Sequence, residues 1–195
     1  SAEGYVRDPE LVINFYNERR KQLLDVEPNA GHTGLAELEK DFNVTVVTQN
    51  VDNLHERAGS THVIHLHGEL TKVCSSRDPY NPRYVRELKP EEYEVKMGDK
   101  AGDGSQLRPF IVWFGEAVPE IETAIGYVEK ADIFVIIGTS MNVYPAAGLL
   151  NYVPRTAEVY LIDPKPVDTH SMRQIHGIQK GASEGVKELK TEILH

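Results

Sequence analysis

Polar residues of three kinds crowd one short stretch of the chain, TQNVDNLHERAGSTHVIHLHGEL at residues 48–70. Two amides and a carboxylate come first, and three of the chain's eight histidines follow within six positions: Gln49, Asn50, Asp52, His62, His65 and His67. Such residues can bind a metal, transfer protons or cap helices. Which of these roles applies depends on the helices and strands that carry the residues.

His67 is a candidate general base, because imidazole titrates near neutral pH. In a regular strand His65 and His67 share one face, while His62 points the other way. A His65-x-His67 pair could chelate a metal, but the sequence offers no matching third ligand. We therefore expect no metal site and interpret His65 as a hydrogen-bonded packing residue. A structural role at a strand end would explain His67 as well.

A second candidate group is Gly138-Thr139-Ser140, which follows a very apolar segment. The glycine permits close backbone approach, and the two hydroxyls and neighbouring N–H groups suit phosphate or ribose oxygens. A glycine turn that caps the next helix explains the same residues equally well.

Tyr16 and Arg19 form a third group, spaced i, i+3 on a predicted helix at 8–24. An inward arginine backed by a phenol hydroxyl is a potential clamp for a carboxylate. The alternative is a solvated arginine within the basic run 19–21, which is favourable near a helix C-terminus.

These residues must be positioned by strands that alternate with helices. Apolar runs predict strands at 44–49, 63–68, 110–115, 132–140 and 158–163, with helices at 8–24, from Asn29, at 52–59, 119–131, 144–153 and 183–194. The alternation predicts an α/β fold, a Rossmann-like parallel sheet with helices on both faces. Ligands bind beyond the carboxyl ends of such strands, so the polar groups there are expected to converge.

Residues 69–109 differ in character, being rich in Pro, Gly and charge. We predict that they form a small inserted module with weak strands. Residues 1–68 and 110–195 would then form the sheet domain. At 195 residues the chain is long enough for one core and such a module.

Composition excludes several functions. The net charge of −9, without a long basic cluster, argues against nucleic-acid binding. No apolar run reaches the roughly 20 residues that span a bilayer. The single cysteine, Cys74, excludes a disulfide framework, and we expect a monomer in a reducing cytoplasm. No nucleophile elbow or P-loop is present, so an enzyme here would need chemistry that does not begin with a protein nucleophile.

Taken together, the polar groups form blocks that resemble the sirtuins, the NAD-dependent protein lysine deacylases. The blocks appear in the family's order and spacing, and they are TQNVDNLH at 48–55, HGEL at 67–70, VWFGE at 112–116, GTS at 138–140 and VYPAA at 143–147. Tyr16-x-x-Arg19 resembles the pair that marks the acidic-acyl branch, which is common among bacterial members.

For the cofactor NAD, the resemblance implies that His67 deprotonates a ribose hydroxyl and that Asn50 belongs to the catalytic set. The remaining NAD-binding residues that it implies lie along the chain at Gln49, Asn50, Val51, Asp52, Gly138, Thr139, Ser140, Asp163 and Ala182.

For the substrate, the resemblance implies acylated-lysine proteins or peptides. Val112, Trp113, Phe114 and Gly115 would pair with the peptide as an added strand. Tyr16 and Arg19 would bind the carboxylate of succinyl- or malonyl-lysine. The acyl oxygen of the substrate attacks C1′ of the ribose as nicotinamide leaves, and water then completes the release of free lysine and O-acyl-ADP-ribose. Deacetylation is expected as well.

Three departures from the family pattern carry expectations of their own. The first strand and the Gly-Ala-Gly-x-Ser loop are missing from the printed residues, so these residues alone are expected to bind NAD poorly. The family's zinc cysteines are absent from 69–109, so no structural zinc is expected. Asp163 stands where many members have Asn, and a carboxylate accepts but does not donate hydrogen bonds.

Two other functions remain open on the same residues. One is an ADP-ribosyltransferase, which would pass the ribose to a protein. The other is a weakly active or non-catalytic NAD-binding module. Retention of Tyr16, Arg19 and VWFGE favours a lysine-acyl substrate, and His67 argues against pure binding because binding alone needs no base.

Overall fold

The structure of the protein is a computed structural model that describes residues 1–138, 146–166 and 173–194. The chain divides into two compact units. The first comprises Ser1–Glu27, Thr48–Asn53 and His65–Pro119, and the second Pro28–Val47, Leu54–Ile64 and Glu120–His195. These boundaries differ from the predicted ones, because 69–109 falls in one unit with the N-terminal helices. The functional division into an NAD-binding domain and an inserted module stays a prediction.

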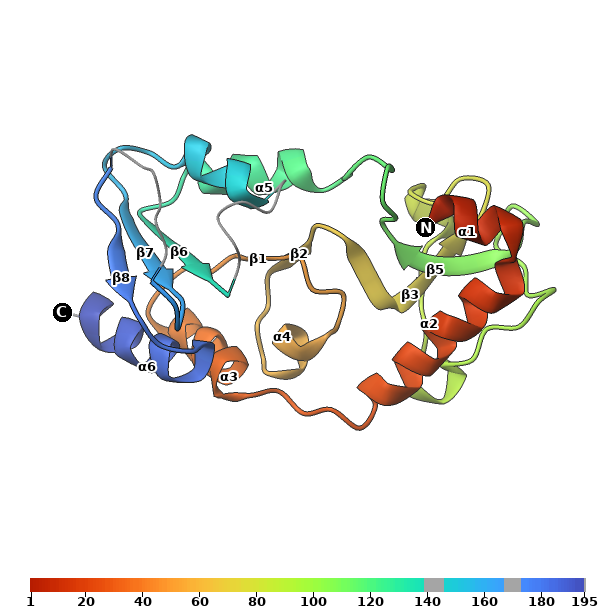
Figure 1. Cartoon of the computed structure of the whole chain (residues 1–195), viewed down its shortest axis with the longest axis horizontal. Helices are drawn as coiled ribbons and strands as arrows, with labels where there is room; N and C mark the ends of the chain where they lie inside the picture. Colours follow the sequence, from red (N-terminus) through yellow and green to blue (C-terminus); the bar gives the residue numbers. More distant parts are fainter. Residues whose placement is uncertain (139–145, 167–172, 195) are drawn as a thin grey trace. The chain divides into compact units, whose positions relative to one another are not determined.

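The second unit contains the parallel sheet. Its strands are β6 (Ile133–Ile137), β7 (Glu158–Ile162) and β8 (His176–Ile178), in the order β6-β7-β8. Within this unit, Figure 1 shows α5 (Ile121–Val128) and the 3-10 helix η4 (Ala146–Tyr152) on one side of the sheet and α3 (Ala30–Glu37) and α6 (Ala182–Ile193) on the other. The predicted Rossmann-like α/β class is confirmed. The sequence pattern missed β8, and the helix expected at 144–153 is a 3-10 helix where it is described.

The core of this unit lies between the sheet and the pair α3 and α6. Its buried residues are Leu38, Tyr160, Ile162, Ile178, Val186 and Leu189. Asn29 caps α3, as predicted, by accepting a hydrogen bond from the His32 amide at 3.1 Å. A Cβ on Gly34 would lie 2.7 Å from Cγ1 of Val186, so glycine there allows α3 and α6 to pack closely.

Two short strands continue from the second unit into the first. They are β1 (Val46–Thr48) and β2 (Val63–His65), joined through the short helix α4 (Leu54–Arg57). The Val46 amide donates to the His62 carbonyl at 3.0 Å, and the Leu66 amide to the Thr48 carbonyl at 2.9 Å. The strand predicted at 63–68 ends at His65, and residues 66–67 form a turn. The rule that His65 and His67 share a strand face therefore does not apply.

The first unit packs helices α1 (Ala2–Arg7) and α2 (Pro9–Leu23) against an antiparallel sheet of order β4-β3-β5. The strands are β3 (Gly68–Ser75), β4 (Arg86–Glu87) and β5 (Leu107–Ile111). This unit also contains the 3-10 helices η2 (Pro82–Tyr84) and η3 (Pro90–Glu92), whereas η1 (Leu38–Lys40) belongs to the second unit. Asp8 caps α2, which has Pro9 at its first turn as predicted.

A single core joins α2 to the predicted module. Its buried members are Ile13, Val73, Leu88, Val95 and Leu107. The Asn17 amide group also bonds both backbone groups of Val95, donating to the carbonyl at 2.8 Å and accepting from the N–H at 2.9 Å. Residues 69–109 therefore share their core with α2 instead of forming one alone.

Beyond β3, a polar cluster ties residues 75–78 to the loop at 103–105. The Ser75 hydroxyl donates to Oδ2 of Asp103 at 2.5 Å and lies 2.9 Å from the Ser105 hydroxyl, which donates to Oδ1 of Asp103 at 2.6 Å. The hydrogen bonds from Ser105 and then Ser75 lower the pKa of Asp103 from 3.8 to about 2. The ionised carboxylate is thus favoured in the folded state.

We expect the Asp103→Asn variant to lose part of its pH-dependent stability in acid. The depressed pKa stabilises the folded state fully above pH 3.8, and this contribution disappears as the pH falls to about 2. Thermal melts between pH 5 and pH 2 should therefore show a smaller acid-induced decrease in melting temperature for Asp103→Asn than for the parent. Asp99→Asn, an exposed change outside the cluster, is the control. Equal acid sensitivity of Asp103→Asn and the parent would contradict this assignment.

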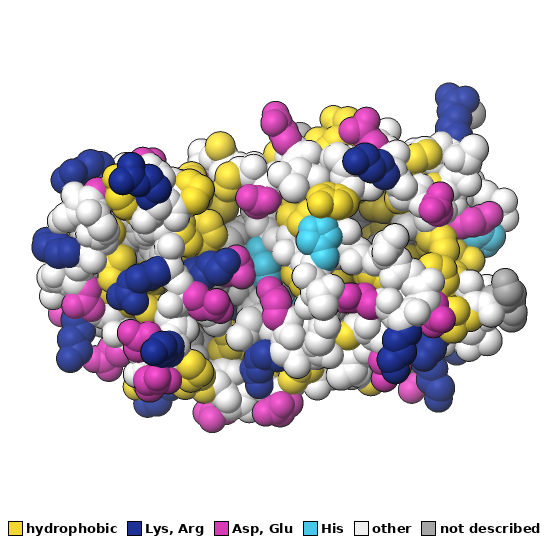
Figure 2. All heavy atoms as spheres, turned by 180° about the vertical axis from the view of Figure 1, so that it is seen from behind, with side chains coloured by type: hydrophobic (Ala, Val, Ile, Leu, Met, Phe, Trp, Pro, Cys, Tyr) yellow, Lys and Arg dark blue, Asp and Glu magenta, His cyan; other side chains and the backbone are white. Residues whose placement is uncertain are grey.

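Figure 2 shows acidic and basic side chains interspersed over one face of the protein. Within the described ranges, no helix has the length and apolar character that crossing a membrane requires.

Candidate functional site

His67 lies in the turn between β2 and β3, where backbone bonds hold it on two sides. Its carbonyl accepts from the Val112 amide at 2.9 Å, next to the pair Gly68↔Ile111 of the β3–β5 ladder. The imidazole is half-buried, and the described part of the chain supplies it with no hydrogen-bond partner. The backbone of His67 is therefore fixed while its ring remains available to a ligand.

The amide–carboxylate segment runs beside this turn. The backbone N–H of Asn50 donates to Oγ1 of Thr48 at 3.0 Å, and the Val51 carbonyl accepts from the backbone N–H of Leu70 at 2.8 Å. Gln49, Val51 and Asp52 are half-buried, and Asn50 is exposed. The structure thus places 49–52 beside the segment 66–70 that contains His67, and their joint role in one site stays a prediction.

The other two histidines of the cluster have structural partners. The buried His65 directs Nδ1 at the Asn50 carbonyl, 3.0 Å away, and thereby holds the amide–carboxylate segment. His62 lies 2.9 Å from the Thr45 hydroxyl through Nδ1 and packs edge-on against Tyr127. The interpretation of His65 as a hydrogen-bonded packing residue is confirmed.

Two buried amide atoms in this segment are unsatisfied. Nε2 of Gln49, a donor, and Oδ1 of Asn53, an acceptor, have no hydrogen-bond partner among the described residues. A buried polar atom in that condition costs about 1–3 kcal/mol, which a matching ligand would remove. Asn53 was missed as a candidate, although it lies inside the block 48–55. Its amide, next to Asp52, was the available signal.

The loop after β5 differs from the strand predicted at 110–115. The strand ends at Ile111, and Gly115 has φ +89°, which a strand does not accommodate. The Trp113 amide donates to Oε1 of Glu116 at 2.7 Å, and the Glu116 amide donates to the Trp113 carbonyl at 2.9 Å. The prediction of a strand at 112–115 is therefore wrong. A peptide-binding role for Val112, Trp113, Phe114 and Gly115 stays a prediction, and Phe114, at 98% exposure, is accessible for it.

A buried ion pair fixes this loop. The Arg108 guanidinium reaches both carboxylate oxygens of Glu116, at 3.2 and 3.3 Å, and also donates to the Ile111 carbonyl at 2.7 Å. Burial raises the pKa of Glu116, but the hydrogen bonds from Arg108 and the Trp113 amide outweigh it and place this pKa below its ordinary value. Sequence reasoning missed Arg108, because nothing in its local pattern marks a buried arginine.

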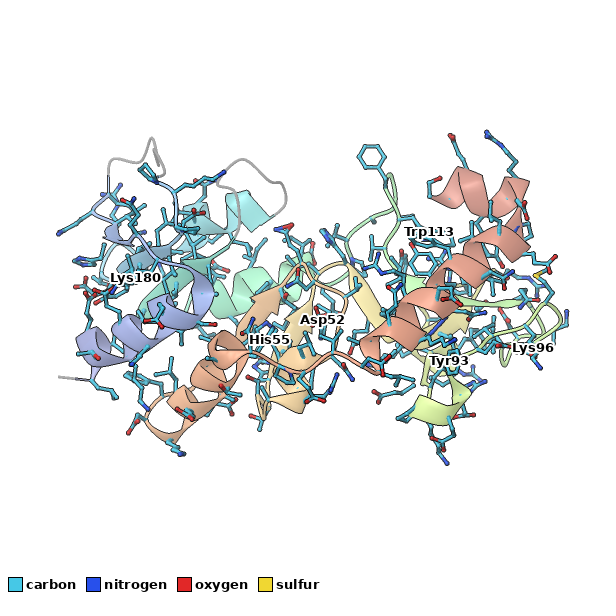
Figure 3. The ribbon with its side chains drawn as sticks, turned by 60° about the horizontal axis from the view of Figure 1, so that its bottom comes forward. Asp52, His55, Tyr93, Lys96, Trp113 and Lys180 are labelled. Atoms are coloured by element: carbon cyan, nitrogen blue, oxygen red, sulfur yellow. The ribbon has the colours of Figure 1, made fainter. Side chains whose placement is uncertain are left out.

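Tyr16 and Arg19 lie on α2 in different environments. The half-buried Tyr16 accepts a hydrogen bond from Nε1 of Trp113 at 3.1 Å, and Figure 3 shows Trp113 beside this helix. Arg19 is exposed, with Cζ 5.9 Å from the ring centroid of Phe15, and no carboxylate of the described residues pairs with it. The Tyr16 hydroxyl therefore lies at the 112–116 loop, and the Arg19 guanidinium, without a carboxylate partner among the described residues, stands three residues further along α2.

The remaining candidates belong to the second unit. Gly138, at φ +61°, follows β6, and its backbone N–H donates to the Ile162 carbonyl at 3.3 Å. Asp163 follows β7, and its backbone N–H donates to the Ile178 carbonyl at 3.1 Å. Ala182 begins α6. Gly138 and Asp163 thus directly follow strands that end earlier than predicted, and α6 begins one residue before the predicted helix at 183–194. Thr139 and Ser140 lie outside the described residues.

Asp163 and Cys74 have environments that limit their chemistry. Oδ1 of Asp163 accepts from the Lys165 amide at 2.8 Å and so stabilises the turn after β7. Cys74 is fully buried, and burial raises the pKa of its thiol to about 12, which makes it unreactive at neutral pH. The expectation that the chain holds no zinc stays a prediction.

The fold and the site define a Rossmann-like α/β protein with polar residues at its strand ends and a half-buried histidine, His67, beside them. The model of the Sir2 family matches residues 1–145, so the chain belongs to the Sir2 family.

Relatives and solved structures agree with this family assignment. The chain is 85% identical to an NAD-dependent protein deacylase of Bacteroides thetaiotaomicron, covering 100% of this chain and 83% of the relative. It is 46% identical to an NAD-dependent protein deacylase of Helicobacter pylori, with 100% and 82% covered. A crystal structure of a Sir2 homologue–NAD complex matches with a TM-score of 0.83 and 35% identity, covering 98% of this chain and 75% of the other. A complex of Sir2 with a p53 peptide and NAD+ matches with a TM-score of 0.77 and 29% identity, covering 97% and 80%.

Proposed function

We propose that this protein removes acidic acyl groups, succinyl or malonyl, from protein lysines, and acetyl groups as well. The coarser activity, NAD-dependent protein deacylation, follows from membership of the Sir2 family and from 85% identity to a protein deacylase. The observation that carries the finer proposal is the pair Tyr16 and Arg19. The Tyr16 hydroxyl is hydrogen-bonded to Trp113, and the Arg19 guanidinium, which pairs with no carboxylate of the described residues, stands three residues away on the same helix.

The residues of the first unit fit the nicotinamide riboside end of NAD. Nicotinamide carries a carboxamide with a donor and an acceptor, which match the unsatisfied Gln49 Nε2 and Asn53 Oδ1. In this proposal Gln49, Asn50, Val51 and Asp52 hold that end. Gly138, Thr139, Ser140, Asp163 and Ala182 serve the adenosine and phosphate end.

The chain's own contribution to the chemistry is positioning and one base. Bound NAD supplies a ribose carbon from which nicotinamide can leave. His67 accepts a proton from a ribose hydroxyl, and Asn50 orients the ribose beside it. The His67 carbonyl accepts a hydrogen bond from the Val112 amide, so the backbone of the base is held against the loop that is expected to bind the peptide.

The proposed preference for acidic acyl groups follows from the negative charge that these groups carry. A succinyl or malonyl group ends in a carboxylate, whereas an acetyl group has none. Arg19 offers a planar fork of donors for that carboxylate, and Tyr16 offers an O–H. Hydrogen bonds to charged groups contribute about 1.5–3 kcal/mol, enough for a selectivity of roughly 10- to 150-fold.

We expect Arg19→Met to lower kcat/KM for desuccinylation about 10- to 100-fold more than kcat/KM for deacetylation. The measurement is mass spectrometry of one peptide sequence carrying succinyl- or acetyl-lysine, with and without NAD. Lys21→Met is the matched control, because it removes an exposed cation two residues further along α2, where residues do not share a face. An equal decrease of both activities in Arg19→Met would reject the carboxylate clamp.

A monomeric state and a cytoplasmic location remain predictions from composition alone.

A further inference from the structure

Trp113 controls the direction of the Tyr16 hydroxyl. An indole N–H is a donor only, so at 3.1 Å it occupies a lone pair of the Tyr16 oxygen. The Tyr16 O–H proton must then point away from Trp113, and the described residues offer it no acceptor. The Tyr16 O–H is thereby left as an available donor about one helical turn from Arg19.

The ring of Trp113 is itself held rigidly. Trp113 is 5% exposed, the Arg108 guanidinium carbon lies 3.8 Å from its ring centroid, and the Tyr5 ring packs at 5.3 Å. Arg108 in turn is 4% exposed and paired with Glu116 through both carboxylate oxygens. Such close cation–aromatic stacking fixes the ring plane and therefore the direction of its N–H.

The backbone of Trp113 is fixed by the same carboxylate. Glu116 accepts from the Trp113 amide at 2.7 Å and from the Tyr80 hydroxyl at 2.9 Å. One ion pair therefore determines both the main-chain position and the ring orientation of Trp113. Trp113 belongs to the loop that is expected to bind the peptide. Its indole N–H also donates to the Tyr16 hydroxyl, which is expected to bind the acyl group.

We propose that Trp113 is a positioning residue for acyl selectivity. Its indole N–H, held by the Arg108–Glu116 pair, directs the Tyr16 O–H toward the carboxylate of an acidic acyl-lysine. This inference rests on the proposed function, because it presupposes that Tyr16 and Arg19 receive that carboxylate. It adds a third residue, Trp113 in the 112–116 loop, which affects acyl selectivity through its hydrogen bond to Tyr16.

The test is a double-mutant cycle with Trp113→Phe, which keeps a ring over Arg108 but removes the donor, and Tyr16→Phe. We expect Trp113→Phe to lower the succinyl-to-acetyl ratio of kcat/KM about tenfold, through KM of the succinyl peptide. In the Tyr16→Phe background the same change should lower the ratio no further. Tyr5→Phe retains the ring contact with Trp113 and should keep the parental ratio.

A second measurement needs no Trp113 variant. Trp113 is the only tryptophan of the chain, so intrinsic fluorescence reports on it alone. We expect succinyl-lysine peptide to change the emission more than acetyl-lysine peptide, and Tyr16→Phe to abolish the difference. Equal responses to the two peptides in the parent protein would contradict the inference.

The outcomes separate the inference from the proposed function. If Tyr16→Phe leaves the acyl ratio unchanged, the carboxylate clamp is wrong and the inference falls with it. If Tyr16→Phe lowers the ratio but Trp113→Phe lowers both activities equally, only the role of Trp113 is wrong. Independent, multiplying effects of the two substitutions on the ratio would also overturn that role.

Discussion

His67→Ala is expected to lower kcat of deacylation by about 10²- to 10⁴-fold, the range that general-base catalysis supplies. The imidazole has no partner among the described residues, whereas the His67 carbonyl holds Val112 at 2.9 Å. Alanine keeps that backbone bond, so the fold and peptide binding should persist while the base is lost. Steady-state turnover of an acyl-lysine peptide with saturating NAD measures the effect, and calorimetric titration of the peptide checks binding.

His62→Ala is the control for this experiment. It removes a histidine from the same short stretch, together with its contacts to Thr45 and Tyr127 in the second unit. We expect a stability loss of about 1 kcal/mol from the lost hydrogen bond and turnover close to that of the parent. A His67→Ala protein that turns over within a few-fold of the parent would exclude His67 as the base.

Gly68→Ala is expected to destabilise the first unit by about 3 kcal/mol or more. Gly68 has φ +88°, and a Cβ there would press against the Phe110 carbonyl and lie 2.9 Å from Cα of Ile111. Both atoms belong to the backbone of β5, which cannot retreat without breaking its pairing with β3. Backbone strain and overpacking therefore add together. For a chain of this size, the corresponding decrease in melting temperature is about 6–12 °C.

Gly98→Ala separates these two contributions. Gly98 also has a positive φ, +101°, but a Cβ there would meet nothing within 4 Å. It should cost only the strain, about 1 kcal/mol. Thermal melts of both variants measure the difference, and equal losses in the two would show that the approach of β5 to Gly68 does not limit the substitution. Because Gly68 follows His67 directly, its variant should lose activity along with stability.

Local pattern predicted most elements of the chain correctly. Asp8-Pro9 marked the start of α2, Asn29 marked the start of α3, and apolar β-branched runs marked β1, β6 and β7. These signals are local, because a cap or an alternation needs only neighbouring residues. The same reasoning missed α1 and β8, whose short sequences carry little periodicity.

The apolar pattern predicted the backbone wrongly at residues 112–115. The apolar run at 110–115 has strand character, yet its strand ends at Ile111, because Glu116 binds the Trp113 amide and Gly115 turns the chain. The inserted module at 69–109 stays a prediction, and the structure adds that Val73, Leu88 and Val95 pack on Ile13 of α2. This packing on Ile13 leaves no mark in the local sequence, because it pairs residues whose own patterns are ordinary.

The sequence by itself determined the family, through polar blocks at strand ends, and the residues that could do its chemistry, namely His67, the amides at 49–50, Tyr16 and Arg19. Only the tertiary structure decided how they are held. Trp113 and Tyr16 are 97 positions apart, and their hydrogen bond forms because α2 and β5 pack in one unit. Hydrogen bonds and ion pairs such as Arg108–Glu116 depend on distances of a few ångströms. Folding sets those distances, and residue spacing along the chain does not.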